Sequence, residues 1–348
     1  MTIVLVLAAL LWGVGWSMKL PLKSRFVMIG VLVCAIIALH LILPEGHPIR
    51  AQTGHSPVIW VFLIVAGLAI HFYLKWFANI KKRAGETTMD LEQETSAMGP
   101  FTDTELNRYA RHIVLREIGG AGQKALKDAS VLVVGAGGLG APALQYLAAA
   151  GVGTIGIIDD DEVDNSNLQR QVIHTDARIG MPKVHSAAHA MKDLNPFVTV
   201  KPYHRRLTDE IATDLIAEYD LVLDGCDNFE TRYLVNKVCV ATNTPLIAAA
   251  LTQWEGQISL YHPKSGAPCY QCIFPTAPAP ELVPSCAEGG VLGPLPGVIG
   301  AMMAVEAVKE ITGAGEGLRG RMMIYDALYA ETRTVKMKPR ADCPVCGT

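Results

Sequence analysis

The chain has 348 residues, half of them hydrophobic, which is enough for one large domain and a further apolar segment. Its formal net charge of −3 excludes a nucleic-acid binder that works through bulk positive charge, so no nucleic-acid partner is expected. Eight cysteines are too few for a disulfide scaffold of this size.

Three runs near the N-terminus contain no Asp, Glu, Lys or Arg: Met1 to Met18, Phe26 to Leu43 and Pro57 to Leu74. Each approaches the ~20 apolar residues that a membrane-spanning helix needs. A signal peptide is the alternative for the first run, but no basic residues precede it. Buried core helices are the alternative for the second and third runs, but they would normally show a polar face. We therefore predict a membrane region over residues 1–78 with three transmembrane helices.

The distribution of basic residues predicts the orientation of these helices. Lys19, Lys23 and Arg25 lie between the first two runs, and residues 75–83 carry further lysines and an arginine after the third. Arg50 is the only Lys or Arg between the second and third runs. By the positive-inside rule, everything after Lys75 faces the cytoplasm. The sequence thus predicts a multi-pass protein of the inner (cytoplasmic) membrane.

Residues 79–103 are mostly polar and contain Gly85 and the pair Gly99-Pro100, which is typical of a linker. A soluble domain is expected over residues 104–348. Its first helix is expected near Thr104, and Arg108 and Arg111 are three residues apart and would share one face of that helix.

The centre of the soluble domain is a β-branched apolar run, Val131 to Val134, which predicts a buried parallel strand. A glycine-rich turn follows it directly, with glycines at positions 135, 137, 138 and 140. Such a turn lets backbone N–H groups approach a phosphate at the start of the next helix. A second strand, Thr154 to Ile158, ends in the acidic cluster Asp159 to Glu162.

Further strands and helices alternate after this point, which predicts a doubly wound α/β sheet. The strand beginning at Leu221 ends in the polar sequence Asp224-Gly225-Cys226-Asp227-Asn228. In open α/β sheets, ligands bind at the carboxyl ends of the strands. We expect the polar groups that follow the strands to meet there.

The G-x-G-x-x-G pattern alone also fits an NAD-dependent oxidoreductase, because Asp159 lies where such enzymes hold the ribose. Arg170 and Lys183 argue for a triphosphate instead, since the neutral nicotinamide half of NAD needs no such cations. Asp227 is suited to Mg²⁺. Together these groups describe nucleotidyl transfer, although each alone is more often a surface charge.

Four cysteines form two C-x-x-C pairs, Cys269/Cys272 and Cys343/Cys346. In a reducing cytoplasm this arrangement favours a tetrahedral structural Zn²⁺ over disulfides. The metal would join the C-terminal end of the chain to the loop after Tyr261.

Seven ordered motifs make the sequence resemble the ubiquitin-activating-enzyme-like (HesA/MoeB/ThiF) adenylyltransferases. They are RYARH at Arg108, GAGGLG at Gly135, DDDEVDNSNLQRQ at Asp159, GMPKV at Gly180, DGCDN at Asp224 and the two C-x-x-C pairs, the second of which is the closing CPVCG. The sequence is most similar to molybdopterin-synthase adenylyltransferases, followed by those of the thiamine pathway. The resemblance runs from about Glu105 to Thr348 and leaves out the apolar front.

The resemblance implies a fold class: a Rossmann-like doubly wound sheet with a zinc-clipped C-terminal part, here preceded by transmembrane helices. The nucleotide-binding half would cover about 104–250, and the carrier-binding and zinc part about 251–348. A homodimer is implied, in which Arg111 reaches the phosphates bound by the neighbouring subunit.

The resemblance also implies individual roles. Asp159 would hold the ribose of ATP, Asn167, Arg170 and Lys183 would contact phosphates, and Asp227 would bind Mg²⁺. The expected nucleotide-binding residues are Gly135, Gly137, Gly138, Gly140, Asp159, Asp161, Asn167, Arg170, Gln171, Lys183, Asp227 and Asn228. The expected catalytic residues are Arg111, Arg170, Lys183, Asp227 and Cys286, the last as a covalent acceptor found in some relatives only.

The implied reaction is ATP-dependent adenylation of the C-terminal glycine of a small ubiquitin-like sulfur-carrier protein ending in Gly-Gly. The first expected carrier is the small subunit of molybdopterin synthase, in molybdenum cofactor biosynthesis; a thiamine-pathway carrier is the second. Because the sequence stops at Thr348, we expect sulfur to arrive from a separate sulfurtransferase. Two further hypotheses stay open at this point: an NAD-dependent oxidoreductase and a membrane scaffold without catalysis.

Overall fold

The computed structural model describes residues 2–44, 46–54, 58–62, 65, 67, 72–73, 75–76, 99–278 and 289–347. The chain divides into two compact units, Met1–Met98 and Gly99–Thr348. Half of the third apolar run, all but the end of the predicted linker, and Cys286 lie outside the described residues.

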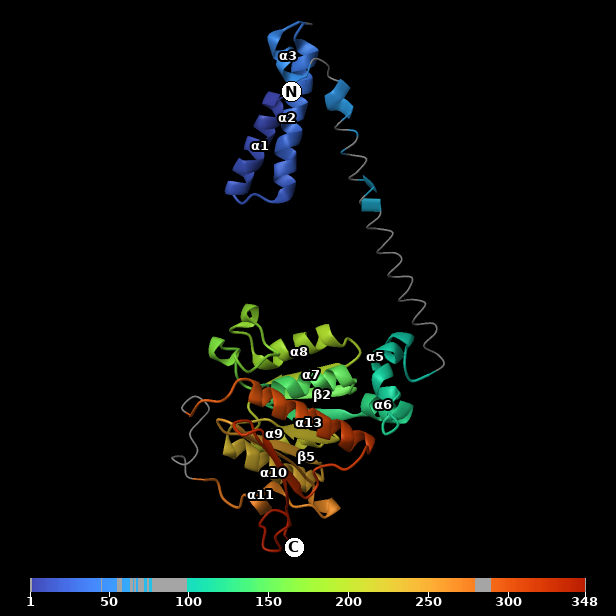
Figure 1. Ribbon diagram of the computed structural model, residues 1–348, viewed down its shortest axis with the longest axis vertical. Helices are drawn as coiled ribbons and strands as arrows, with labels where there is room; N and C mark the ends of the chain where they lie inside the picture. The colour runs from blue at the N-terminus through green and yellow to red at the C-terminus, as the bar shows by residue number, and fades with distance from the viewer. Residues whose placement is uncertain are drawn as a thin grey trace. The chain divides into compact units, whose positions relative to one another are not determined.

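The first unit contains helices α1 (Thr2–Ser17), α2 (Leu22–Ile42) and α3 (Pro48–Thr53), labelled in Figure 1. Within α2, the 19 residues Ser24–Ile42 have a mean hydropathy of 2.5, so this helix is long and apolar enough to cross a membrane. α1 is shorter, with 16 residues. Among the described residues, one of the three predicted spans therefore has the required length.

The second unit is built on an eight-stranded sheet of order β3-β2-β1-β4-β5-β6-β7-β8. The first five strands are parallel: β1 (Ser130–Val134), β2 (Thr154–Asp159), β3 (Thr199–His204), β4 (Leu221–Asp224) and β5 (Leu246–Leu251). The last three are antiparallel: β6 (Glu255–Tyr261), β7 (Arg321–Asp326) and β8 (Glu331–Lys336). The predicted doubly wound, Rossmann-like sheet is confirmed.

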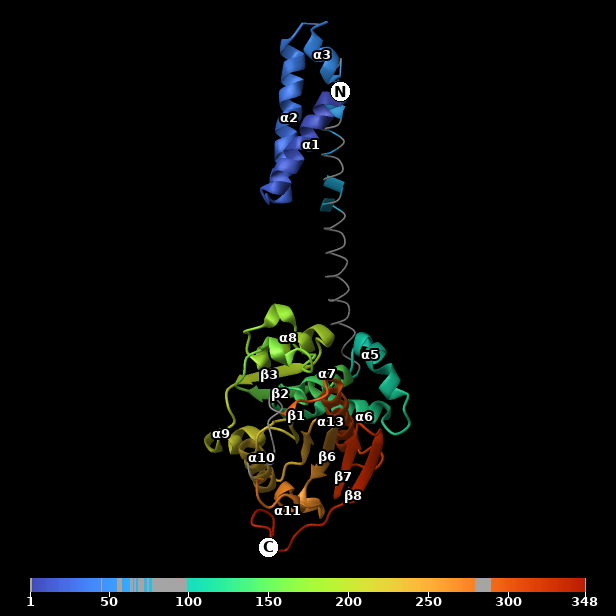
Figure 2. The same cartoon turned by 60° about the vertical axis from the view of Figure 1, so that its left-hand side comes forward.

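Helices cover both faces of this sheet (Figures 1 and 2). One face carries α7 (Gly140–Ala150), α8 (Lys183–Leu194) and α13 (Pro294–Thr312), and the other carries α9 (Asp209–Ile216) and α10 (Phe229–Thr242). The remaining helices are α5 (Asp103–Ile113), α6 (Gly119–Asp128), α11 (Tyr270–Ile273) and the 3-10 turns Asn165–Asn167, Asp176–Arg178 and Pro263–Ser265.

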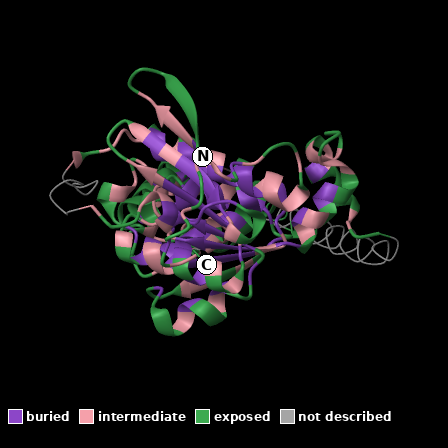
Figure 3. Ribbon diagram, turned by 90° about the horizontal axis from the view of Figure 1, so that it is seen from below, coloured by how far each residue is buried: buried purple, intermediate pink, exposed green. Residues whose placement is uncertain are grey.

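Strand β1 lies at the centre of the core because both of its faces are apolar. Val131 and Val133 join the cluster with α7, α8 and α13, while Leu132 and Val134 join the cluster with α9 and α10. All four are at most 3% exposed. A strand covered on both faces needs a continuous apolar run, which is the pattern the sequence shows. Figure 3 shows the buried residues gathered in the sheet between helices whose outer sides are exposed.

Three elements of six residues or more in the second unit were not predicted from the sequence: α6, α10 and β8. Strand β8 is exposed along its whole length and Val335 is its single apolar residue, so no apolar alternation marks it. The buried face of α10 includes Arg232 and Asn236, which hides its helical apolar pattern. Helix α6 contains three glycines, which lower its intrinsic helix propensity.

Candidate nucleotide site

The site is built where strand order reverses between β2-β1 and β4-β5, at the carboxyl ends of β1 and β4. Val134 pairs with Asp224 at the end of these neighbouring strands, so the turns that follow begin at the same level. We call Gly135–Gly140 the glycine loop and Gly225–Asn228 the Asp227 loop. The two loops touch: a Cβ at Gly135 would lie 3.1 Å from the carbonyl oxygen of Gly225.

Two glycines are required in this geometry. Gly135 has φ of 95°, a left-handed conformation that side chains disfavour. A Cβ at Gly140 would lie 1.9 Å from the carbonyl oxygen of Gly135, a distance that no side chain can occupy. The glycine loop therefore folds back on itself at the start of α7, and helix N-termini of this kind bind phosphate groups.

The peptide groups of Ala136 hold the glycine loop to the sheet on two sides. Its N–H donates to Asp159 Oδ2 at 2.7 Å, and its carbonyl oxygen lies 2.9 Å from His174 Nε2. The second ring nitrogen of His174 lies 2.9 Å from Ser186 Oγ. Burial raises the pKa of Asp159, and hydrogen bonds from the N–H groups of Ala136 and Asp161 oppose that shift.

Lys183 lies at the start of α8 beside this acidic group. Its side chain is 6% exposed, and its Nζ is 2.6 Å from Asp161 Oδ2, whose own side chain is 67% exposed. The backbone N–H of Lys183 also donates to the Asp161 carbonyl at 2.9 Å. A buried cation with a solvent-exposed partner can exchange that partner for a phosphate oxygen.

The segment after β2 carries the remaining predicted residues of this half. The side-chain stem of Arg170 lies against the glycine loop, since a Cβ at Gly138 would be 3.9 Å from Arg170 Cγ. Its Nη1 donates to the Ser166 carbonyl at 3.0 Å. Gln171 is 4% exposed and its Oε1 has no hydrogen-bond partner among the described residues. Asn167 is half-buried in the same segment.

The Asp227 loop presents an exposed carboxylate at the neighbouring strand end. The next residue, Asn228, caps α10 by accepting the N–H of Thr231 at 2.9 Å. The side chain of Asn228 therefore has a structural partner besides its predicted nucleotide role. The fold brings the glycine loop, Asp159, Asp161, Gln171, Lys183 and Asp227 to one edge of the sheet.

Arg111 does not join this group within its own chain. It is exposed on α5, which packs on α6, and α6 ends just before β1 begins. Arg111 therefore lies toward the amino end of β1, and no hydrogen bond or ion pair joins it to another described residue. The neighbouring Arg108 donates to the Leu194 carbonyl at 2.6 Å instead.

Sequence reasoning missed His174 and Arg232, although both hold the loops of the site. Arg232 is 5% exposed and donates to the carbonyl oxygens of Cys226 and Ala249 at 2.7 and 2.9 Å. Its spacing from Val235, Asn236 and Cys239 places it on the buried face of α10. That helical spacing is the signal that could have identified it.

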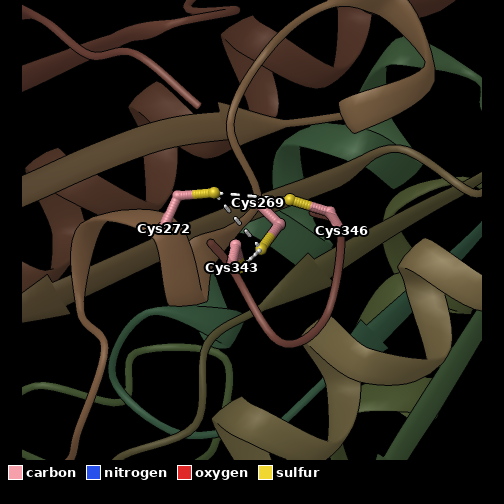
Figure 4. A group of neighbouring side chains, drawn as sticks. All are labelled: Cys269, Cys272, Cys343 and Cys346. Carbon is pink, nitrogen blue, oxygen red and sulfur yellow. Dashed lines mark hydrogen bonds between the residues drawn. The ribbon is translucent and has the colours of Figure 1, made fainter. Parts of the chain in front are cut away.

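The four predicted metal ligands lie together (Figure 4). Their sulfur atoms all lie within 4.8 Å of one another, with Cys269–Cys272, Cys269–Cys343 and Cys272–Cys346 separations of 3.9, 3.6 and 3.3 Å. Tetrahedral zinc with Zn–S bonds of about 2.3 Å requires sulfur atoms about 3.8 Å apart. The cluster is therefore compatible with zinc.

The four thiols of this cluster differ in pKa: burial raises the pKa of Cys269 and raises that of Cys346 to about 11, whereas backbone groups favour the thiolate of Cys343. The N–H of Arg340 points to the sulfur of Cys272 at 3.4 Å. Burial raises the pKa of Cys343, but hydrogen bonds from the backbone of Cys346 and Val345 outweigh that effect and lower it to about 7. Thiolates are the form that binds metal.

Comparison with known proteins assigns the chain to a family. The sequence profile of the ThiF family matches residues 109–345. The chain belongs to the ThiF family. Two relatives named sulfur carrier protein adenylyltransferase (Thermus thermophilus) and SAMP-activating enzyme E1 (Haloferax volcanii) are 48% and 49% identical. The matches cover 71% and 70% of this chain and 93% and 90% of those proteins.

Further ThiF-family similarities extend the comparison to a longer relative and to solved structures. Mouse adenylyltransferase and sulfurtransferase MOCS3 is 48% identical over 78% of this chain, and the match spans 61% of that protein. A crystal structure of Escherichia coli MccB with ATP has a TM-score of 0.62 at 27% identity, covering 69% of this chain and 74% of that one.

Zinc removal gives a first prediction. The full-length chain should purify with about one zinc per chain. Cys272→Ser should lose the metal and lower the melting temperature, because the ligand joins α11 to the C-terminal end of the chain. Metal content by plasma mass spectrometry and thermal unfolding measure both effects. The matched control is Cys34→Ser, an exposed cysteine of the first unit, which should keep the zinc. Zinc-free wild-type protein with unchanged melting after chelation would contradict a structural zinc.

His174 gives a second prediction, for stability against pH. Burial lowers the pKa of its ring below the usual 6.5, while the hydrogen bond to Ala136 opposes the shift and Lys183 and Arg178 add to it. The unfolded chain therefore takes up a proton at a higher pH than the folded chain does. The free energy of unfolding should keep its full value above about pH 6.5 and should decrease as the pH falls below 6.5.

Substituting His174 measures how much this residue contributes to the pH dependence of stability. His174→Gln should flatten the fall of melting temperature between neutral and mildly acidic pH, because glutamine keeps an N–H donor for Ala136 without titrating. His189, an exposed histidine on α8, supplies the control: His189→Gln should keep the wild-type slope. Parallel slopes in wild type and His174→Gln would show that His174 does not set the pH dependence.

Proposed function

We propose that the chain adenylates the C-terminal glycine of a small ubiquitin-like sulfur-carrier protein that ends in Gly-Gly, using ATP. One observation carries the proposal: the glycine loop, Asp159, Lys183 and Asp227 converge near the carboxyl ends of β1, β2 and β4. The 48% identity to a sulfur carrier protein adenylyltransferase supports it. The carrier that we favour is the small subunit of molybdopterin synthase; a thiamine-pathway carrier is the second candidate.

The reaction brings two anions together. A carboxylate oxygen of the carrier attacks the α-phosphorus of ATP, the bond to the bridging α–β oxygen breaks, and pyrophosphate leaves with that electron pair. The product is an acyl-adenylate. Catalysis of this kind rests on positioning and on charge neutralisation rather than on a protein nucleophile. Lys183 and Arg170 would contact phosphate oxygens, and the N–H groups of the glycine loop would bind the phosphates at the start of α7.

Asp159 and Asp227 would have different roles. Asp159 would accept hydrogen bonds from the ribose hydroxyls, as acids at this strand end do in nucleotide-binding sheets. Asp227 would hold Mg²⁺, since its carboxylate is exposed and carboxylate oxygens are preferred ligands of that ion. Bound Mg²⁺ would neutralise the developing charge on pyrophosphate.

An NAD-dependent oxidoreductase is less well supported, because Lys183 and Arg170 would then face no triphosphate. A ligand that binds only the folded chain raises its melting temperature. ATP with Mg²⁺ should therefore raise the melting temperature, and NAD should not. A scaffold without catalysis would show no turnover of ATP with any carrier.

Asp227 gives the third prediction. Wild-type protein with a Gly-Gly carrier should exchange labelled pyrophosphate into ATP, and Asp227→Asn should lower the exchange rate about a hundredfold or more at fixed Mg²⁺. Asp209→Asn, an exposed carboxylate at the start of α9, is the matched control and should keep the wild-type rate. Unchanged exchange in Asp227→Asn would remove Mg²⁺ binding from this residue.

We also propose a homodimer in which Arg111 completes the partner's nucleotide site. The outer sides of α7 and α13 support it, since Tyr146, Val298 and Val305 are exposed there although the two helices pack on each other. Exposed apolar patches of this kind mark protein interfaces. Arg111, exposed and without a partner among the described residues, is then free to reach another subunit.

Mixed dimers give the fourth prediction. Arg111→Ala and Asp227→Asn should each be inactive alone, but co-expressed chains form some dimers with one intact site. Random pairing in a two-fold dimer should restore about a quarter of the wild-type exchange. No recovery in purified mixed dimers would place Arg111 in the site of its own chain, or outside any site.

Finally, we propose that the first unit anchors the enzyme in the inner membrane with the second unit in the cytoplasm. Only 11% of the apolar Ser24–Ile42 window is buried, whereas a core helix of a soluble protein would be mostly buried. Arg25 and Lys19 lie at one end of this helix. The fifth prediction is that the full-length chain stays with membranes after alkaline carbonate extraction, whereas release into the supernatant would exclude a spanning anchor.

A further inference from the structure

The Asp227 loop is held by a buried ion pair. Asp224, the last residue of β4, is fully buried, and its Oδ1 accepts the N–H of Cys226 at 2.9 Å. Arg232, on α10, donates from Nη2 to the carbonyl oxygen of the same Cys226 at 2.7 Å. The Nε of Arg232 lies 3.8 Å from Asp224 Oδ2. The N–H of Cys226 is therefore held by Asp224 and its carbonyl oxygen by Arg232, and these two charged side chains lie next to each other.

Arg232 also ties this loop to the neighbouring strand. Its Nη1 donates to the Ala249 carbonyl of β5 at 2.9 Å, and its guanidinium lies over the ring of Tyr270, 5.6 Å from the ring centre. The planar guanidinium thus spans β4, β5 and the loop between β4 and α10. A lysine could not make both carbonyl contacts, because its charge is a single point.

The residue that follows Cys226 is Asp227. Its carboxylate is exposed and makes no hydrogen bond to a described residue, so the side chain itself has no local restraint. Its position is set by the backbone that carries it, and that backbone is fixed at the preceding residue by Arg232 and Asp224. Partners that orient a metal ligand typically change metal affinity about 10–100-fold when removed.

We propose that Arg232, paired with Asp224, is the positioning residue for Asp227, and that it sets the affinity of the site for the divalent cation that accompanies ATP. This inference rests on the proposed function, in which Asp227 is the Mg²⁺ ligand. Arg232 touches neither nucleotide nor carrier in this role. It acts by holding the Cys226 carbonyl and thereby the carboxylate that follows.

The test compares the Mg²⁺ dependence of carrier-dependent ATP–pyrophosphate exchange in full-length variants. Arg232→Lys retains the positive charge beside Asp224 and loses one of the two carbonyl contacts. Removing Arg232 alone would leave a buried, unpaired carboxylate. The second variant is therefore the double substitution Asp224→Asn with Arg232→Gln, which replaces the ion pair by two neutral amides. Lys237→Gln, an exposed residue of the same helix, is the control.

We expect both variants to need about 10-fold to 100-fold more Mg²⁺ for half-maximal exchange, with a kcat near the wild-type value once Mg²⁺ is saturating. Metal-free ATP should bind each variant as tightly as it binds the wild type. A lowered melting temperature or kcat with a wild-type Mg²⁺ midpoint would overturn the positioning role and leave the proposed function intact. Absence of exchange in the wild type itself would remove the proposed function, and the role of Arg232 with it.

Discussion

The contact between the turns after β1 and β4 is the constraint on which the rest of the site depends. Parallel pairing sets Val134 beside Asp224, so the backbone of Gly135 meets that of Gly225 so closely that a Cβ at Gly135 would lie 3.1 Å from the Gly225 carbonyl oxygen. The glycine loop closes by placing Gly140 against the Gly135 carbonyl. A single added carbon at Gly140 would require the first turn of α7 to move, and the N–H groups at the start of α7 would move with it.

In each of these turns, one residue has both its N–H and its carbonyl oxygen bound by side chains. In the glycine loop, the N–H of Ala136 is bound by Asp159 and its carbonyl by His174; in the Asp227 loop, Asp224 and Arg232 bind the N–H and carbonyl of Cys226. A loop whose peptide N–H and carbonyl are both hydrogen-bonded to buried side chains is restricted in its movement. The exposed carboxylate of Asp227 makes no hydrogen bond to a described residue, so it is available for the role that we propose for it.

Lys183 and Arg232 are both buried cations, but they differ in how easily each can exchange its carboxylate partner. Lys183 pairs with the largely exposed Asp161, whose carboxylate water can solvate when the pair separates. A phosphate can therefore take the place of Asp161 while Lys183 stays paired. Arg232 pairs with a fully buried carboxylate, and separating such a pair costs several kcal/mol. Lys183 is thus suited to bind substrate, and Arg232 is suited to hold the backbone.

The sequence predicted the parts of this arrangement that follow from pattern and spacing. The apolar run before Gly135, the acids after Ile158 and the polar turn after Leu223 identified three strand ends and, through the doubly wound order, their meeting place. His174 was missed because its partner is the Ala136 carbonyl, 38 residues earlier in the chain, which no local pattern reveals. Arg232 was missed because its partners are backbone carbonyls, and its helical spacing marks only that it lies on the buried face of α10. Strand β8 was not predicted because an exposed edge strand does not need an apolar face.

The most direct measurement is intact-protein mass spectrometry of a Gly-Gly carrier after incubation with the full-length chain, ATP and Mg²⁺. The proposed reaction predicts a carrier that gains the mass of one adenylyl group, which is AMP less one water, at its C-terminal carboxyl group, and no gain in a carrier that lacks its last glycine. The proposal would be contradicted if the folded, zinc-loaded chain left Gly-Gly carriers of both the molybdopterin-synthase and the thiamine-pathway type unmodified.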